Sequence, residues 1–132
     1  MGEYVANEVI FQMIRKGNVV KDSKVLVLGI TFKENCPDIR NSRVIDVIQS
    51  LKKQGVKVDV FDPFANAAEV HHEYNLDLIT EESKLMSTYH AVILAVAHGD
   101  FIKKGWRSKL SDRGILYDVK GVLDKQTIDG RL

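Results

Sequence analysis

The sequence predicts an α/β fold: a doubly wound, Rossmann-like, mainly parallel sheet with helices on both faces, preceded by an N-terminal helix. Unbroken apolar runs at residues 25–29 and 91–96 are typical of strands buried on both faces of a sheet. Segments whose apolar residues recur at helical spacing alternate with these runs. With 132 residues, 45% hydrophobic content and no internal repeat or low-complexity linker, the chain is long enough to bury one substantial core.

Residues 1–17 are predicted to form a helix that ends near Gly17, because their apolar residues follow helical spacing. The apolar face consists of two adjacent rows: Val5, Val9 and Met13, and beside them Ala6, Ile10 and Ile14. Two alternatives stay open for this face. It packs against the domain's own sheet, or the helix continues a longer one and its exposed end supports self-association.

A second helix is predicted at residues 42–54, directly after the first strand. Gly55 follows its last turn and stops it. Asn41 or Ser42 is placed to cap its first turn. Its apolar positions at helical spacing are Val44, Ile45, Ile48 and Leu51.

The loop that joins this strand to this helix carries two cations, Lys33 and Arg40. The leading amides and the positive end of the helix dipole lie beside the same loop, which favours phosphate. Arginine adds a planar fork that holds a phosphate through two hydrogen bonds. The loop therefore predicts an anion site, with the alternative that both side chains are simply solvated.

The rest of the chain continues the alternation. We expect strands at 56–61, 76–79, 90–96 and 114–118, of which the first ends at Asp62-Pro63, the second is short and the last precedes a short tail. Between them we expect a weak helix within 64–74 and a helix at 81–87 that starts at Thr80 and Ser83. Residues 100–109 are expected to form a polar helical or irregular segment. Ligands of such sheets lie outside the carboxyl ends of the strands. The loop after Gly29, Asp62, the Ala97-His98 pair and residues 118–121 are therefore expected to converge at one edge.

Charge and composition exclude several classes of partner. The formal net charge is +1, with 19 basic and 18 acidic residues, so no overall field favours nucleic acid or an anionic membrane. No apolar run approaches the roughly 20 residues that span a bilayer, and no secretory signal pattern opens the chain. A single cysteine, which cannot form an internal disulfide, fits a reducing compartment. We expect a soluble, cytoplasmic protein without nucleic-acid or membrane partners.

The pattern Gly29-x-x-Phe32-Lys33 followed by Asp38-x-Arg40-x-Ser42 resembles the signature that opens the C-terminal domain of the UDP-glucose/GDP-mannose dehydrogenase family. Residues 58–63, 91–95 and 117–124 are similar to later strands of that domain, and residues 1–17 resemble the end of the helix that links the family's two nucleotide-binding domains. Within the family, the chain most resembles the bacterial branch that acts on UDP-N-acetylhexosamines.

This resemblance implies a UDP-sugar-binding domain at residues 21–132, with residues 1–20 as the end of the inter-domain linker helix. The implied parent enzyme is NAD-dependent and oxidises a UDP-hexose or UDP-N-acetylhexosamine to the uronic acid for surface polysaccharide synthesis. The implied partners are the UDP-sugar, the remainder of the parent chain and, through the N-terminal helix, a second copy. The family's catalytic cysteine, Gly-rich NAD fingerprint and general base lie in an N-terminal domain that this sequence does not contain, so no catalytic residue is assigned and the chain is expected to be inactive alone.

The resemblance also assigns site residues. Phe32 and Lys33 are expected to contact the UDP portion of the substrate, although Phe32 also fits an ordinary core position. Arg40 is expected to reach toward the NAD pyrophosphate. Enzymes specific for UDP-glucose have two arginines after the last strand, where this sequence has Lys120-Gly121. Either Lys120 contacts the substrate in their place or the sugar pocket differs.

Other chemistry-bearing residues have simpler interpretations. Cys36 lacks an adjacent base and a Gly-rich setting, so we expect it to be inert. His71-His72 lacks a second ligand cluster, so no metal site is expected. His98 ends a buried strand, where histidine is usually structural. The segment around Trp106 is expected to be a solvated basic face.

Two other functions remain open. The chain could be a stand-alone Rossmann-like interaction or assembly domain without nucleotide binding, or a complete small enzyme around Cys36 or His98.

Overall fold

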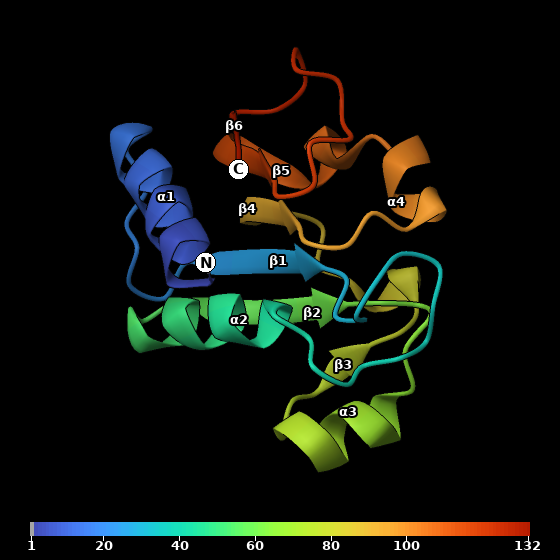
Figure 1. The fold of residues 1–132 in the computed structure, drawn as a ribbon. Coiled ribbons are helices and arrows are strands. Elements are labelled where there is room, and N and C mark those ends of the chain that lie inside the picture. The colour runs from blue at the N-terminus through green and yellow to red at the C-terminus, as the bar shows by residue number, and fades with distance from the viewer. Residues whose placement is uncertain (1) are drawn as a thin grey trace.

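The computed structural model describes residues 2–132 and contains one six-stranded sheet whose neighbouring strands are all parallel. The strand order is β3-β2-β1-β4-β5-β6 (Figure 1). This is the doubly wound arrangement that the sequence predicts. The order of strands reverses between β1 and β4, and ligands of such folds bind in the crevice outside the carboxyl ends at that point.

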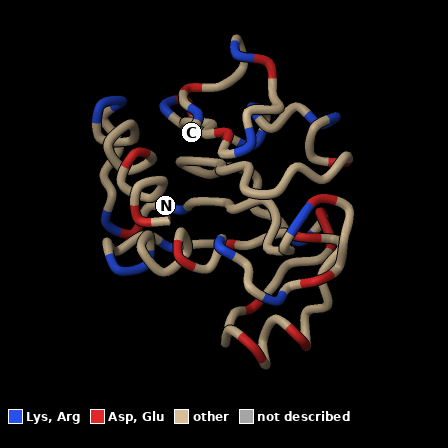
Figure 2. The backbone as a smooth tube through the Cα atoms, in the orientation of Figure 1, with Lys and Arg blue, Asp and Glu red and all other residues tan. Residues whose placement is uncertain are grey.

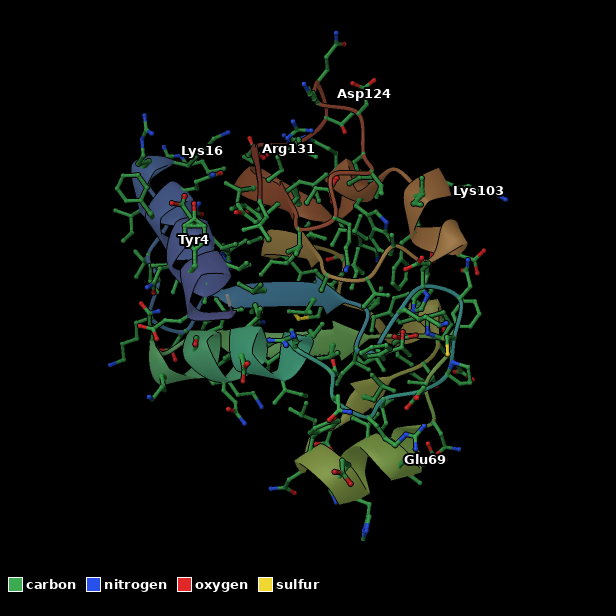
Figure 3. All side chains as sticks on the ribbon, in the orientation of Figure 1. Tyr4, Lys16, Glu69, Lys103, Asp124 and Arg131 are labelled. Atoms are coloured by element: carbon green, nitrogen blue, oxygen red, sulfur yellow. The ribbon has the colours of Figure 1, made fainter. Side chains whose placement is uncertain are left out.

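The central strands agree with the predicted apolar runs. They are β1 (Lys24–Leu28), β2 (Lys57–Phe61) and β4 (Tyr89–Leu94), flanked by the two-residue β3 (Leu78–Ile79). The strand β5 (Leu110–Asp118) begins earlier than predicted, and β6 (Gly130–Arg131) lies within the predicted tail. Asp129 holds β6 in place, because its carboxylate accepts the Leu116 N–H at 2.8 Å and pairs with Arg107 and Lys16. In Figure 3, Lys16 accordingly lies at the end of α1 next to this last strand.

Alternate residues of the strands face two separate cores. Val25 and Val27 face the layer formed by α1 (Gly2–Arg15), α2 (Val44–Lys53) and α3 (Ala67–Tyr74). Leu26 and Leu28 face the opposite layer, where α4 (Gly99–Lys103) and a 3₁₀ turn at Trp106–Lys109 lie. All four strand side chains are fully buried. Each stabilises the fold by about 1.5–3 kcal/mol, and both faces of the sheet are covered.

The helix α1 packs on this domain's own α2 and β5, so its apolar face is buried within the domain, as the first of the two alternatives predicts. Val5, Val9 and Met13 are fully buried. Ile14, predicted to share the apolar face, is 57% exposed, so that part of the prediction is wrong. Together with Tyr4 and Phe11 it lies on the outer side of α1, where Figure 3 shows Tyr4.

Two local predictions are wrong. Arg43, rather than Asn41 or Ser42, occupies the N-cap position of α2, and no side-chain bond caps that helix among the described residues. Asn41 adopts a left-handed backbone (φ 58°), and the buried Ser42 Oγ has no hydrogen-bond partner within residues 2–132. The predicted helix at 81–87 is a 3₁₀ turn at Glu82–Lys84. The next residues leave helical geometry because Met86 N–H and C=O bond Tyr89 and Lys109.

Acidic and basic residues are interspersed along the tube in Figure 2, in keeping with the balanced charge. No helix within residues 2–132 is long and apolar enough to cross a membrane.

Candidate functional site

The buried carboxylate of Asp62, just after β2, holds the start of the loop that follows β1. Its Oδ2 accepts the N–H groups of Ile30 at 2.8 Å and Thr31 at 3.3 Å, and its Oδ1 accepts the Phe64 N–H at 2.8 Å. Burial alone raises the pKa of Asp62, but hydrogen bonds from His98, Ile30 and Phe64 outweigh it, so the pKa lies below its usual value. Asp62 is therefore a charged group that ties β2 to the loop after β1.

His98, at the N-cap of α4 in the segment that follows β4, ties the same loop to a third strand. Its Nε2 lies 3.1 Å from Asp62 Oδ2, and its Nδ1 accepts the Asn35 N–H at 2.8 Å. The Asn35 side chain accepts the Gly99 N–H at 3.0 Å in return. Phe64 stacks on the imidazole with ring centroids 4.4 Å apart. The ring is fully buried, so these contacts, rather than solvent, surround it.

The anchored loop presents Phe32 and Lys33 to solvent. The Phe32 N–H donates to the Asp38 carbonyl at 2.6 Å and closes the loop, while its side chain is 58% exposed. The alternative interpretation of Phe32 as an ordinary core residue is therefore wrong. An exposed aromatic ring on an anchored loop is a suitable surface for a flat, partly apolar ligand.

A cavity of about 260 Å³ opens where β1, β4 and β5 end and α2 begins, at the reversal of strand order. Its walls are mainly aliphatic, with an aromatic ring and two cationic side chains at the rim. The lining residues are Val5, Thr31, Phe32, Asn41, Arg43, Val44, Val47, Ala95, Val96, Val119 and Lys120. A small apolar pocket with a few convergent cations suits a phosphorylated ligand that carries a ring.

Lys120 reaches this cavity because Asp118 shapes the loop after β5. The buried Asp118 carboxylate accepts the N–H groups of Lys120 at 3.0 Å and Gly121 at 2.9 Å, and that of Leu123 at 2.7 Å. Gly121 adopts φ 68°, a conformation that glycine adopts without strain. The sequence prediction that residues 118–121 lie at the same edge as the loop after β1 is confirmed.

Arg40 and Lys33 lie outside the cavity lining. Arg40 forms a forked pair with Asp38, with Nε to Oδ1 and Nη2 to Oδ2 both at 3.0 Å. This pair lowers the pKa of Asp38 to about 2 and raises that of Arg40. Asp38 also shapes the loop, since its Oδ1 accepts the Arg40 N–H. Ser42 does not cap the helix.

Sequence reasoning missed Arg43. It lies at the start of α2, lines the cavity with Phe32 and Lys120, and has no ion-pair partner in the part of the chain that the structure describes. The signal was available, because Arg43 directly follows the motif that ends at Ser42. A cap at Asn41 or Ser42 would place Arg43 inside the first turn of the helix, where an arginine is usually an exposed helix residue without a functional role.

The other candidate residues lie outside the cavity lining. Cys36 is half-buried in the loop after β1, and His71 and His72 are exposed on α3. No group of three or more His, Cys, Asp or Glu within residues 2–132 is arranged to hold a metal ion. Trp106 is buried and donates to the Phe101 carbonyl at 2.9 Å, so the basic segment around it presents no aromatic surface.

A sequence profile described as the UDP-glucose/GDP-mannose dehydrogenase family, UDP binding domain, matches residues 26–125. The chain is 47% identical to the UDP-N-acetyl-D-glucosamine 6-dehydrogenase of Salmonella typhi, in a match that covers 100% of this chain and 31% of that protein. It is 39% identical to the enzyme of the same name from Pseudomonas aeruginosa, which it covers to 32%. The chain thus spans about a third of the length of the curated relatives it matches.

Solved structures agree on the fold. The NDP-N-acetyl-D-galactosaminuronic acid dehydrogenase from Methanosarcina mazei Go1 superposes with a TM-score of 0.79 at 19% identity, over 96% of this chain and 26% of that one. The UDP-D-ManNAc dehydrogenase from Pyrococcus horikoshii gives a TM-score of 0.75 at 18% identity, over 98% of this chain and 30% of that one. At these identities the likeness supports the fold and its strand order.

Proposed function

This chain belongs to the UDP-glucose/GDP-mannose dehydrogenase family, and we propose that it supplies the UDP-binding half of the substrate site in an NAD-dependent enzyme. The proposed parent enzyme oxidises the primary alcohol of a UDP-hexose or UDP-N-acetylhexosamine to a carboxylate, with two hydrides passing to two NAD. The resemblance to the N-acetylhexosamine branch is confirmed by the two relatives named for UDP-N-acetyl-D-glucosamine. The product would feed surface polysaccharide synthesis.

One observation carries the assignment: the cavity at the reversal of strand order combines Phe32, Arg43 and Lys120. The two cations, which pair with no carboxylate within residues 2–132, can neutralise a diphosphate, and an exposed ring can pack on a sugar or base. The matched family domain is described as UDP-binding. Lys33, exposed on the same anchored loop, remains a proposed contact to the outer part of the nucleotide.

NAD is proposed to be held mainly by another domain of the parent enzyme. A dinucleotide fingerprint needs closely spaced glycines so that the backbone can approach the pyrophosphate, and the turn after β1 offers only Gly29. A Cβ on Gly29 would meet the Val96 side chain and backbone, so this glycine serves strand packing rather than ligand approach. The turn after β1 therefore does not form a dinucleotide cradle, and Arg40 is the group we propose to reach the pyrophosphate.

The proposed division of labour has further parts that stay predictions. Residues 1–20 would end the linker helix from the catalytic domain, and residues 21–132 would form the UDP-sugar domain. The single Cys36 fits the predicted cytoplasmic location. No catalytic group is assigned to this chain, so NAD reduction by the chain alone with any UDP-sugar would contradict the proposal.

Equilibrium titration with UDP and UDP-N-acetylglucosamine tests the binding role. We expect weak, saturable binding, since a site shared between two domains loses affinity when halved. Replacing Lys120 or Arg43 with Ala should weaken UDP binding about fivefold to tenfold, because each removes a charge-assisted hydrogen bond. Lys103→Ala is the matched control, because Lys103 is exposed on α4 at the far side of the sheet from α2 (Figure 3). Equal affinities for all variants would overturn the assignment of the cavity.

The exposed outer side of α1 favours a second candidate function, assembly with a second copy. Tyr4, Phe11 and Ile14 each expose more than half of their surface on that helix. Light scattering distinguishes the two roles, because concentration-dependent dimers without nucleotide binding would favour an assembly domain. Replacing Phe11 and Ile14 with polar residues should then abolish the dimers and leave the cavity unchanged.

A further inference from the structure

We propose that His98, as a neutral imidazole with its proton on Nε2, is the positioning residue that holds the loop of residues 30–41 in its ligand-presenting shape. The effect on ligand affinity rests on the proposed UDP binding, whereas the effect on the loop itself does not. The two ring nitrogens of His98 have opposite roles.

The tautomer follows from the partners of the ring. The backbone N–H of Asn35 points at Nδ1 from 2.8 Å, and a backbone amide can only donate, so Nδ1 accepts. The proton therefore sits on Nε2, which faces Asp62 Oδ2 at 3.1 Å and Thr31 Oγ1 at 3.3 Å. The Thr31 hydroxyl donates its own hydrogen bond to the Lys33 carbonyl at 2.9 Å, so its oxygen can accept one from Nε2–H. Every donor then meets an acceptor, which this tautomer alone achieves.

The ring joins three strand ends at one point. Asp62 comes from β2, His98 from the β4 side, and Thr31 and Asn35 from the loop after β1. Phe32 and Lys33 lie between the two loop residues that the imidazole contacts. The position of both proposed nucleotide contacts therefore depends on bonds to His98, although His98 itself is fully buried and does not face the cavity lining.

Any other state of the ring breaks this arrangement. An imidazolium carries N–H groups at both nitrogens, so Nδ1–H would oppose the Asn35 N–H and leave a buried donor unpaired. The Nδ1-protonated tautomer would also aim the Nε2 lone pair at the Asp62 carboxylate. The titratable group that contacts the ring is Asp62, which favours the imidazolium; the Asn35 amide and the apolar rings of Phe64 and Phe101 disfavour it. Acid that protonates His98 should therefore release Asn35 and loosen the loop.

Two substitutions separate the two ends of the ring. His98→Asn places an amide oxygen near the position of Nδ1, where it accepts the Asn35 N–H, and loses the contact with Asp62. His98→Gln places its side-chain NH₂ near the position of Nε2, where it donates to Asp62, and loses the contact with the Asn35 N–H. Both keep a buried amide, so they form a matched pair for the role of the Asn35 bond.

The test combines ¹⁵N NMR of the imidazole with UDP titration of the full 132-residue chain. At neutral pH we expect an unprotonated Nδ1, a protonated Nε2 and an Asn35 amide that is protected from hydrogen exchange. His98→Gln should lose that protection and bind UDP about fivefold to tenfold more weakly, whereas His98→Asn should keep both. In the wild type, Asn35 protection should disappear at the pH where the ring gains its second proton, and in His98→Asn it should not.

The contrary results are specific. A proton on Nδ1 at neutral pH, or Asn35 protection that survives in His98→Gln, overturns the proposal. If His98→Gln does not fold, the wild-type titration decides, and an Asn35 amide that ignores protonation of the ring contradicts the role. Should UDP fail to bind any variant, the proposed function fails, but the tautomer and the exchange of Asn35 still decide this inference.

Discussion

Two acid–base pairs hold the loop of residues 30–41, and they differ mainly in their contact with water. Asp62 and His98 are fully buried at the root of the loop, where the carboxylate also accepts three backbone N–H groups. Asp38 and Arg40 lie near its far end, with the guanidinium exposed. Breaking a buried pair leaves an uncompensated group away from water, which costs several kcal/mol, whereas an exposed pair contributes little and is screened by water and salt. The root of the loop is therefore fixed, and its far end can rearrange toward a ligand.

The largest expected effect is the loss of the buried carboxylate. Asp62→Ala leaves three backbone N–H groups and the His98 proton without their acceptor, which should cost about 3–5 kcal/mol of unfolding free energy. Urea denaturation measures it. Asp38→Ala is the matched control at the exposed pair and should leave the denaturation midpoint nearly unchanged. Equal losses in both variants would erase the distinction between the two pairs.

Acid should affect the root of the loop in a defined direction. The folded-state pKa of Asp62 lies below its usual value of 3.8, so its contribution to stability is full above that value. This contribution is lost as the pH falls from about 4 through the lower folded pKa. Asp129 has a lowered pKa for similar reasons and adds to the same trend. Urea denaturation between pH 7 and pH 3 should therefore show that the free energy of unfolding falls less on acidification in Asp62→Asn than in the wild type. An equal fall in both proteins would contradict this.

A smaller effect is expected at the exposed Asp38–Arg40 pair. Asp38→Asn keeps an oxygen that accepts the Arg40 N–H and removes the charge that holds the guanidinium. The released Arg40 should bind inorganic pyrophosphate about twofold more tightly, in line with the small worth of exposed pairs. Calorimetric titration checks this, and the gain should vanish when Arg40→Ala is added. A gain that persists in the double variant would assign the anion to another cation.

The smallest effect is expected where the loop meets α2. Ser42→Ala removes a buried hydroxyl that has no partner within residues 2–132. The substitution should change the unfolding free energy by less than about 0.5 kcal/mol, or stabilise the protein slightly. Thermal denaturation is sufficient to measure it. A clear loss of stability would mean that the hydroxyl has a partner after all, such as a bound water.

The layout of the fold could be predicted from the sequence because its signals are local. The strands β1 and β4 show in the sequence as the apolar runs 25–29 and 91–96, and alternation with helices implies the parallel order. The strand β6 carries no such signal, because two residues cannot show a period. The strand β6 is positioned instead by the contacts of the neighbouring Asp129 with Leu116 and Arg107, which lie far from it in the sequence.

The candidate site was predictable in part for the same reason. The motif residues Phe32 and Lys33, and Lys120 on the loop after β5, show in the sequence. The sequence also places Asp62 and His98 at this edge, but it does not show the bond between them, because the two residues lie 36 positions apart in the chain. Arg43 was missed since the capping rule that favours Asn41 or Ser42 is a local preference, and the left-handed backbone of Asn41 overrides it.

An NMR titration of the ¹⁵N-labelled chain with UDP, UDP-N-acetylglucosamine and NAD tests the central claim most directly. Saturable shifts should appear with the UDP compounds in the amides of residues 30–43 and 118–122, while those of α4 stay unchanged. NAD should shift the Arg40 region weakly or not at all, because the rest of its site is proposed to lie elsewhere. No shifts in these two loops at millimolar UDP would contradict UDP binding by this domain and favour the assembly role of α1.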